Sequence, residues 1–270
     1  MATGLEPILS WPTPELRPRG LFLDTVPSIP WVNRYGFGVT FQPMDLADLS
    51  LIVMPTTTPC ATEADQPAAR ECKAAVVQTA FNVIDSITGP SREWTQEELV
   101  ADIERRWPLL ISEAFAREML AGTGGSDHNL TADGVGATTP ATVREGIAEL
   151  EEQMALGLGN TLGFIHLTPS ALVYAVTNGT VSYNNGRYYS PGGHLVVADA
   201  GYQVTETTTT TMFATGLVRW AAGPREARMD TVSDSLVMGT VKNQLMWTEQ
   251  AYGIIVFDPA TVYKTVATRA

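Results

Sequence analysis

The residues that could support catalysis or bind a metal are few and scattered along the sequence. The histidines are His128, His166 and His194, and no two of them have the four-residue spacing that puts a pair of zinc ligands on one helix face. Ser126, Asp127 and His128 are of the types found in a catalytic triad, but triads are assembled from distant segments, and consecutive residues cannot converge in that way. We therefore interpret this segment as a polar loop.

Glycine-rich segments and paired carboxylates also fail to form a known chemical motif. Residues 122–126 lack the lysine of a phosphate-binding loop, and residues 157–163 have one residue too many for the dinucleotide fingerprint and follow a predicted helix rather than a strand. The glutamate pairs at 97–98 and 151–152 are adjacent on predicted helices, so their side chains point about 100° apart and are expected to be solvated. The sequence predicts no catalytic, cofactor-binding or metal-binding residue, and no cofactor.

Aromatic residues and cysteines have structural explanations. Trp107, Phe115 and Trp220 could form a ligand patch, but core packing is the expected role. Cys60 and Cys72 are too few for a disulfide framework and fit no zinc pattern, so we expect reduced thiols and assembly in a reducing cytosol.

Composition excludes several classes of protein. Among 270 residues, 17 Lys and Arg face 29 Asp and Glu, which gives a net charge of −12. This balance argues against a dedicated nucleic-acid binder, and an apolar fraction of 44% with 17% charged residues argues against an acidic disordered chain. We expect neither a secretory signal nor a membrane span, since no window of about 18 apolar residues occurs.

The elements that would position any site begin with a proline-rich N-terminal segment. Prolines at 7, 12, 14, 18, 27 and 30 exclude a helix or central strand, yet Trp11, Phe22 and Trp31 are apolar and need a cover. This arm is expected to lie either on its own domain or on a neighbouring subunit, and the sequence leaves both alternatives open. Residues 36–72 are again extended and could form a long projecting hairpin.

A strand and a long helix follow. Residues 73–88 are rich in β-branched residues and predict a strand that ends at Gly89–Pro90. Thr95 and Glu98 form a capping box, and a helix of about 39 Å is expected over 96–121, with a stop at Gly122. Its predicted apolar stripe is Leu99, Ile103, Trp107, Leu110 and Ala114, and Pro108 predicts a kink or a break into two helices.

The second half predicts one more helix and several strands. A Gly/Asp/Thr-rich connection over 122–138 precedes a helix capped by Thr139, with Pro140 in its first turn and glycines 157 and 159 as its stop. The expected buried face of that helix consists of Val143, Ile147, Leu150 and Met154. Strands are expected over 163–167, 212–221, 245–257 and 262–267, two-residue hairpin turns at 178–179 and 185–186, and an exposed or edge strand at 207–211.

The order of these elements resembles the major capsid protein of tailed bacteriophages, with its Hong Kong 97-type shell fold. The resemblance covers most of the chain and is nearest to short capsid proteins of phages of actinobacteria. It rests on order and spacing and on these stretches: EELVADIERRWPLLISEAFAREMLAG, TPATVREGIAELEE, GFIHLTPSAL, MFATGLVRW and TEQAYGIIVFDPATVYKTVA.

The resemblance implies an α+β fold with four parts. These are an N-terminal arm (1–35), an extended loop (36–72), a peripheral domain with a long spine helix (73–139 and 236–270) and an axial domain (140–235). Some members crosslink subunits through a Lys–Asn isopeptide bond, but Lys73 lies at the base of the extended loop rather than within it.

The implied function is a major capsid protein without enzymatic activity. Copies would self-assemble into pentamers and hexamers of an icosahedral head that encloses double-stranded DNA without sequence-specific binding. The chain would be a component of the virion, assembled in the bacterial cytoplasm, with scaffold, portal and possibly decoration proteins as partners and no membrane. Alternatives are an encapsulin-type bacterial nanocompartment shell, a soluble hydrolase with a β-rich domain, and a head-completion or tail protein.

Overall fold

The computed structural model describes residues 20–31, 39–41, 76–90, 96–122, 128–136, 142–159, 161–203, 209–233 and 243–268. The helices are α1 (Phe22–Thr25), α2 (Gln96–Ala121), α3 (Leu130–Asp133), α4 (Val143–Leu158), α5 (Pro169–Thr177), η3 (Ala200–Tyr202) and η4 (Pro259–Thr261). The strands are β1 (Val39–Phe41), β2 (Val76–Gln78), β3 (Phe81–Pro90), β4 (Val135–Gly136), β5 (Phe164–Leu167), β6 (Ser182–Asn184), β7 (Arg187–Tyr189), β8 (Leu195–Ala198), β9 (Thr209–Thr215), β10 (Val218–Ala222), β11 (Glu226–Ser233), β12 (Asn243–Phe257) and β13 (Val262–Thr268).

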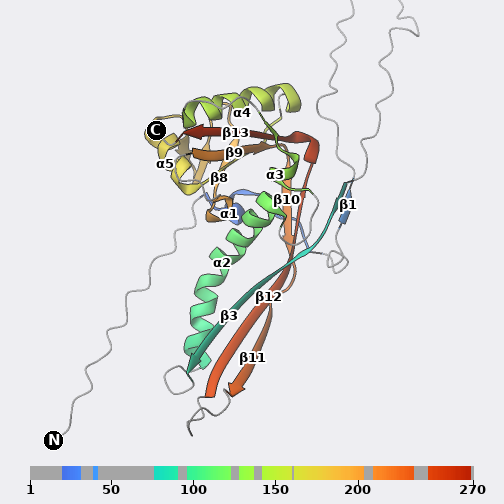
Figure 1. The fold of residues 1–270 in the computed structure, drawn as a ribbon, viewed down its shortest axis with the longest axis vertical. Helices are drawn as coiled ribbons and strands as arrows, with labels where there is room; N and C mark the ends of the chain where they lie inside the picture. The colour runs from blue at the N-terminus through green and yellow to red at the C-terminus, as the bar shows by residue number, and fades with distance from the viewer. Residues whose placement is uncertain are drawn as a thin grey trace, which may run out of the picture.

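A seven-stranded sheet forms one part of the molecule, with the strand order β4-β13-β9-β5-β8-β7-β6 (Figure 1). Its side chains alternate between two hydrophobic clusters, as the two-residue period of a strand requires. Met212 and Ala214 of β9 join α4 and α5 on one face, whereas Phe213 between them joins α2 on the other. Because both faces are covered, every side chain of β5 is buried.

A four-stranded sheet and α2 form the second, elongated part of the molecule (Figure 1). The long strand β12 pairs with β3 along one edge, and with β11 and then β10 along the other. One face of this sheet packs on α2. A Cβ at Gly253 would lie 2.6 Å from the Phe115 ring and 2.7 Å from the Phe81 ring, so glycine lets these two rings meet over β12.

The long helix α2 has the predicted bounds, and Gly122 ends it with a positive φ of 61°. The expected break at Pro108 does not occur, since this exposed proline lies inside one continuous helix. The predicted stripe is partly wrong. Leu110 and Ala114 are only half-buried, and the buried positions recur every four residues over Ile103, Trp107, Ile111, Phe115 and Met119. After Trp107 the buried row lies one residue later in the sequence than the predicted stripe, because α2 contacts a sheet on one side and η3 on the other.

The start of α4 was predicted three residues too early. Thr142, not Thr139, caps the helix, and its hydroxyl accepts a hydrogen bond from the Glu145 amide (3.2 Å). The expected buried face is confirmed. Gly157 lies inside the helix, where the Tyr263 hydroxyl fills the space that a Cβ would need, and Gly159 ends it. The connection before α4 also holds the one-turn helix α3, which Asn129 caps.

One of the two predicted hairpin turns is present. Asn185 and Gly186 both have positive φ and join β6 to β7, as expected. Asn178 and Gly179 instead terminate α5, a helix that the sequence analysis did not predict. An Asn-Gly pair suits either role, because both need a residue that tolerates positive φ.

The strands near residue 210 differ from the prediction. Thr210 and Thr211 are buried in β9, an interior strand, rather than exposed at an edge. The expected strand over 212–221 is two strands in different sheets, separated at Gly216–Leu217. The expected strand over 73–88 is observed as β2 and β3, with a break at residues 79–80. The strands expected over 163–167, 245–257 and 262–267 are confirmed as β5, β12 and β13.

For part of the N-terminal segment, the structure shows which surface covers its apolar residues. Residues 20–31 pack on the chain's own body, with Phe22 and Val26 in the core. Residues 1–19 and 32–35 of the expected arm and most of the expected loop lie outside the described residues. The Thr95 cap, Cys60, Cys72 and Lys73 lie outside them as well. Among the described helices, none is long and apolar enough to cross a membrane.

Candidate assembly interface

The three histidines occupy separate places and have structural partners. His166 is fully buried, with ring nitrogens 2.8 Å from the Tyr202 hydroxyl and 2.9 Å from the Thr215 hydroxyl. Burial lowers the pKa of His166 to about 3, so the ring is neutral at physiological pH. His194 accepts a hydrogen bond from the Gly163 amide (3.1 Å), and burial lowers its pKa against the opposing effect of Glu151.

The remaining chemical candidates form no catalytic or metal centre in the described part of the chain. His128 lies 3.2 Å from the Asp133 carboxylate, while Ser126 and Asp127 lie outside the described residues. No group of three or more His, Cys, Asp or Glu residues converges among the described residues. Glu151, expected to be solvated, is half-buried and accepts a hydrogen bond from the Gly192 amide (2.6 Å).

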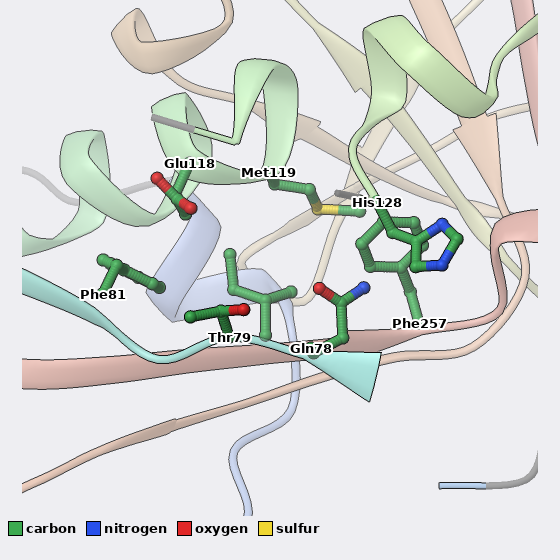
Figure 2. Close-up of a pocket in the computed structure, with 8 residues that line it drawn as sticks. Gln78, Thr79, Phe81, Glu118, Met119, His128 and Phe257 are labelled. Atoms are coloured by element: carbon green, nitrogen blue, oxygen red, sulfur yellow. The ribbon is translucent and has the colours of Figure 1, made fainter. Parts of the chain in front are cut away.

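A small pocket lies between β2, β3, α2 and β12 (Figure 2). Glu118 and His128 stand at opposite sides of it in this view, with Met119 between them. The lining contains neither serine nor cysteine, and its one hydroxyl side chain is that of Thr79. The lining residues are Gln78, Thr79, Phe81, Glu118, Met119, His128, Ile255 and Phe257.

The aromatic residues Trp107, Phe115 and Trp220 pack in a core, as expected from the sequence. Phe115 is fully buried, and its ring packs edge-to-face against Trp220 (5.4 Å between centroids) and Phe81 (4.8 Å). Trp107 is also buried, with the Arg225 guanidinium 5.3 Å above its ring centre. These rings fix α2 to the four-stranded sheet.

Helix α5 carries the surface feature most suggestive of function. It begins at Thr168, whose hydroxyl accepts a hydrogen bond from the Ala171 amide (3.3 Å), and Pro169 fits its first position. Its inner face buries Ala171 and Ala175, yet its outer face is also apolar, with Val173 64% and Tyr174 38% exposed.

No residue of α5 is charged, which is unusual for a helix with a solvent-facing side. Other large exposed apolar side chains in the same part of the molecule are Leu156, Leu162, Val176 and Tyr183. An apolar surface of this kind is typical of a contact with another protein.

A second apolar surface lies on the elongated part of the molecule. Ile84 of β3 and Tyr252 of β12 are exposed, while Val83 and Ala251 next to them face α2. The outer face of the four-stranded sheet is therefore partly apolar, and exposed apolar side chains occur on both parts of the chain.

Comparison with known proteins finds this architecture among solved structures. No protein-family model matches the sequence, and no curated protein does. Among solved structures, a chain from Gordonia phage Cozz matches with a TM-score of 0.56 at 13% identity, covering 96% of this chain and 89% of that one. A chain from Mycobacterium phage Adephagia gives a TM-score of 0.55 at 12% identity, with 99% and 94% covered.

A chain from the capsid of an empty GTA particle with C5 symmetry matches with a TM-score of 0.50 at 11% identity, and the alignment covers 96% of this chain and 95% of that one. These alignments extend over nearly the whole of each chain, so the likeness concerns the arrangement of α2 and the two sheets rather than one common motif. The chain has the α+β Hong Kong 97-type fold of phage capsid proteins.

Proposed function

We propose that this chain is the major capsid protein of a bacteriophage, whose copies assemble into pentamers and hexamers of a closed icosahedral head around double-stranded DNA. The observation that carries the proposal is the nearly full-length structural likeness to phage chains and to a chain of a GTA capsid. A fold shared from end to end supports a shared use of the whole chain as a shell subunit.

The exposed apolar surfaces supply the physical basis for assembly. A subunit of a closed shell touches several copies of itself, and symmetric repetition turns modest contacts into a stable particle. The uncharged outer face of α5 is proposed as one such contact. The net charge of −12 suits a container for DNA, because like charge disfavours binding of the packed polymer.

The proposed domains follow the two sheets. The peripheral domain would contain α2 with β3, β10, β11 and β12, and the axial domain would contain the seven-stranded sheet with α4 and α5. This division moves residues 218–233 to the peripheral domain, and 135–136 and 262–268 to the axial domain, relative to the boundaries expected from the sequence. Residues 1–35 and 36–72 remain the proposed arm and extended loop.

We further propose a purely structural role, without enzymatic activity or cofactor, in the virion. Assembly would take place in the bacterial cytoplasm, and scaffold, portal and possibly decoration proteins would be partners. The structural likeness to chains of phages and of a GTA capsid supports this role.

Electron microscopy of the purified full-length chain tests the function directly. We expect closed shells of uniform size, and particles recovered from a phage-producing host should contain nuclease-protected double-stranded DNA. A stable monomer at high concentration would contradict the proposal. Shells filled with a folded enzyme and free of DNA would identify a nanocompartment instead.

A pair of variants tests the contact made by α5. Val173 and Val135 are equally exposed at 64%, but only Val173 belongs to α5. We expect Val173→Asp to block assembly while the subunit stays folded, because a desolvated carboxylate is costly in an apolar contact. Val135→Asp is the matched control and should assemble normally. Equal assembly of both variants would exclude α5 from the interface.

A further inference from the structure

Residues 20–31, here named the clasp, connect the two sheets directly. At one end the Gly20 carbonyl accepts a hydrogen bond from the Ala198 amide of β8 (2.8 Å). At the other end the Ile29 amide donates to the Trp220 carbonyl of β10 (2.7 Å), and the Trp220 indole donates to the Val26 carbonyl (2.7 Å). One short segment therefore bonds to both parts of the molecule.

A buried carboxylate holds the middle of the clasp. Asp199 is 1% exposed, and one of its oxygens accepts hydrogen bonds from the Phe22 amide (3.2 Å) and the Ser112 hydroxyl (2.8 Å). The other oxygen accepts from the Gly201 amide (3.1 Å). The Ser112 hydroxyl in turn accepts from the Leu23 amide (3.3 Å). The clasp, α2 and η3 thus share one polar centre, and charged acceptors make such bonds comparatively strong.

Aromatic packing reinforces the same attachment. Phe22 is fully buried, and its ring centre lies 6.0 Å from that of Phe115 on α2. Phe115 also packs against Phe81 of β3 and Trp220 of β10. The Phe22 ring therefore rests on the residue that joins α2 to the four-stranded sheet.

Two short links connect the sheets directly along the chain, and they lie close together in space. Gly216–Leu217 joins β9 to β10, and residues 258–261 join β12 to β13. These two links touch, since the Gly216 amide donates to the Thr261 hydroxyl (3.3 Å). Two short links at one place would by themselves form a pivot. The angle between the parts is restrained by α2, which packs in one apolar cluster with both sheets, and by the clasp.

We propose that the clasp sets the angle between the two sheets, and that releasing it changes the curvature of the shell. The second half of this statement rests on the proposed capsid function. The clasp reaches the seven-stranded sheet at Ala198 and the four-stranded sheet at Trp220, which gives it contacts on either side of the pivot.

The test measures the distance between the two parts in the full chain. Spin labels are placed at Asn82 on β3 and Arg187 on β7, both exposed, after Cys60 and Cys72 are replaced by serine. Labelled chain is diluted with an excess of unlabelled chain, so that only distances within one subunit are recorded. The weakened clasp is the double variant Ser112→Ala with Trp220→Phe, which removes three of the hydrogen bonds above without opening a large cavity.

We expect the distance distribution to become about twofold broader, or to shift, in the double variant and in Phe22→Ala. Ile147→Ala is the control, because Ile147 is equally buried but belongs to the cluster under α4. It should lose stability and keep the wild-type distribution. An unchanged distribution in the double variant would overturn the proposal, even if Phe22→Ala failed to fold.

Particle diameters measured by electron microscopy separate the two proposals. Failure of the wild-type chain to form shells would refute the capsid function, while the spin-label distances would still decide the role of the clasp. Altered or mixed diameters in the double variant would support the link to curvature. Wild-type diameters despite broadened distances would refute that link.

Discussion

The clasp and α5 bury their apolar residues in opposite ways. The clasp is irregular and proline-containing, yet Phe22 and Val26 lie in the subunit's own core. Helix α5 is regular and well capped, yet Val173, Tyr174 and Val176 face outward. For the N-terminal segment the sequence left open a cover on its own domain or on a neighbouring subunit, and the helix was not predicted at all.

The difference shows that regular secondary structure does not determine whether the apolar side chains of a segment are buried within the subunit. The clasp has internal hydrogen bonds only at the single turn of α1, so its other amides need outside partners. The amides of Phe22, Leu23 and Ile29 find them at Asp199, Ser112 and Trp220. A helix satisfies its own backbone groups and can present apolar side chains on both sides. A self-sufficient helix is therefore well suited to carry a contact between copies.

Truncating Phe22 is expected to produce the largest effect. Phe22→Ala should lower the free energy of unfolding by about 3–5 kcal/mol, since it leaves a cavity against Phe115. Denaturant unfolding measures this loss. Removal of residues 1–19 keeps every contact of the clasp and should leave stability near the wild-type value, whereas removal of residues 1–31 should cost more than Phe22→Ala. A stable chain lacking residues 1–31 would show that the clasp is not part of the core.

Acid should destabilise the part of the molecule that carries α5, through His166. The pKa of this ring is about 3 in the folded chain and near 6.5 when unfolded, so the unfolded chain binds more protons between these values. Stability is therefore lost as pH falls from about 6.5 towards 3, by about 2 kcal/mol between pH 7 and pH 5. His166→Asn should remove this contribution in unfolding curves recorded at both pH values. An identical pH dependence in the variant would exclude His166 as its source.

Removing one hydrogen bond of the clasp should have a smaller effect. Trp220→Phe keeps an aromatic ring beside Phe115 but loses the bond from the indole to the Val26 carbonyl. We expect a loss of about 1 kcal/mol in thermal or denaturant unfolding. A loss as large as that of Phe22→Ala would mean that ring packing, rather than the hydrogen bond, dominates at this position.

Truncation on α5 should have the smallest effect on the subunit. Tyr174→Ala removes a ring that is already 38% exposed, so the unfolding free energy of the unassembled chain should change by less than about 0.5 kcal/mol. A loss of several kcal/mol would mean that Tyr174 belongs to the subunit core, and the contrast with the clasp would fail.

Local sequence patterns gave good predictions where the structure depends on residues that are close together in the chain. The bounds of α2, the buried face of α4 and the turn at Asn185–Gly186 follow from capping residues, four-residue spacing and positive φ. Where two roles share one local chemistry, prediction failed. Asn178–Gly179 suits a hairpin turn or a helix end, and the threonines of β9 suit an edge or an interior strand.

The candidate interface was the least predictable part. The apolar run around Val173 carries no charge that would mark an exposed face, so no sequence signal distinguished its outer side from its inner one. The polar centre at Asp199 joins residues 22 and 112, which are too far from it in the chain for any spacing rule to relate them.

The sequence by itself determined the order of the elements, the long helix and the absence of a recognisable catalytic motif, because these depend on neighbours along the chain. Only the tertiary structure decided that the N-terminal segment clasps its own body, that β9 and β10 part into two sheets, and that α5 keeps an apolar face outside. Those outcomes depend on which surfaces compete for the same apolar side chains. That competition takes place between segments distant in sequence, where local periodicity carries no information.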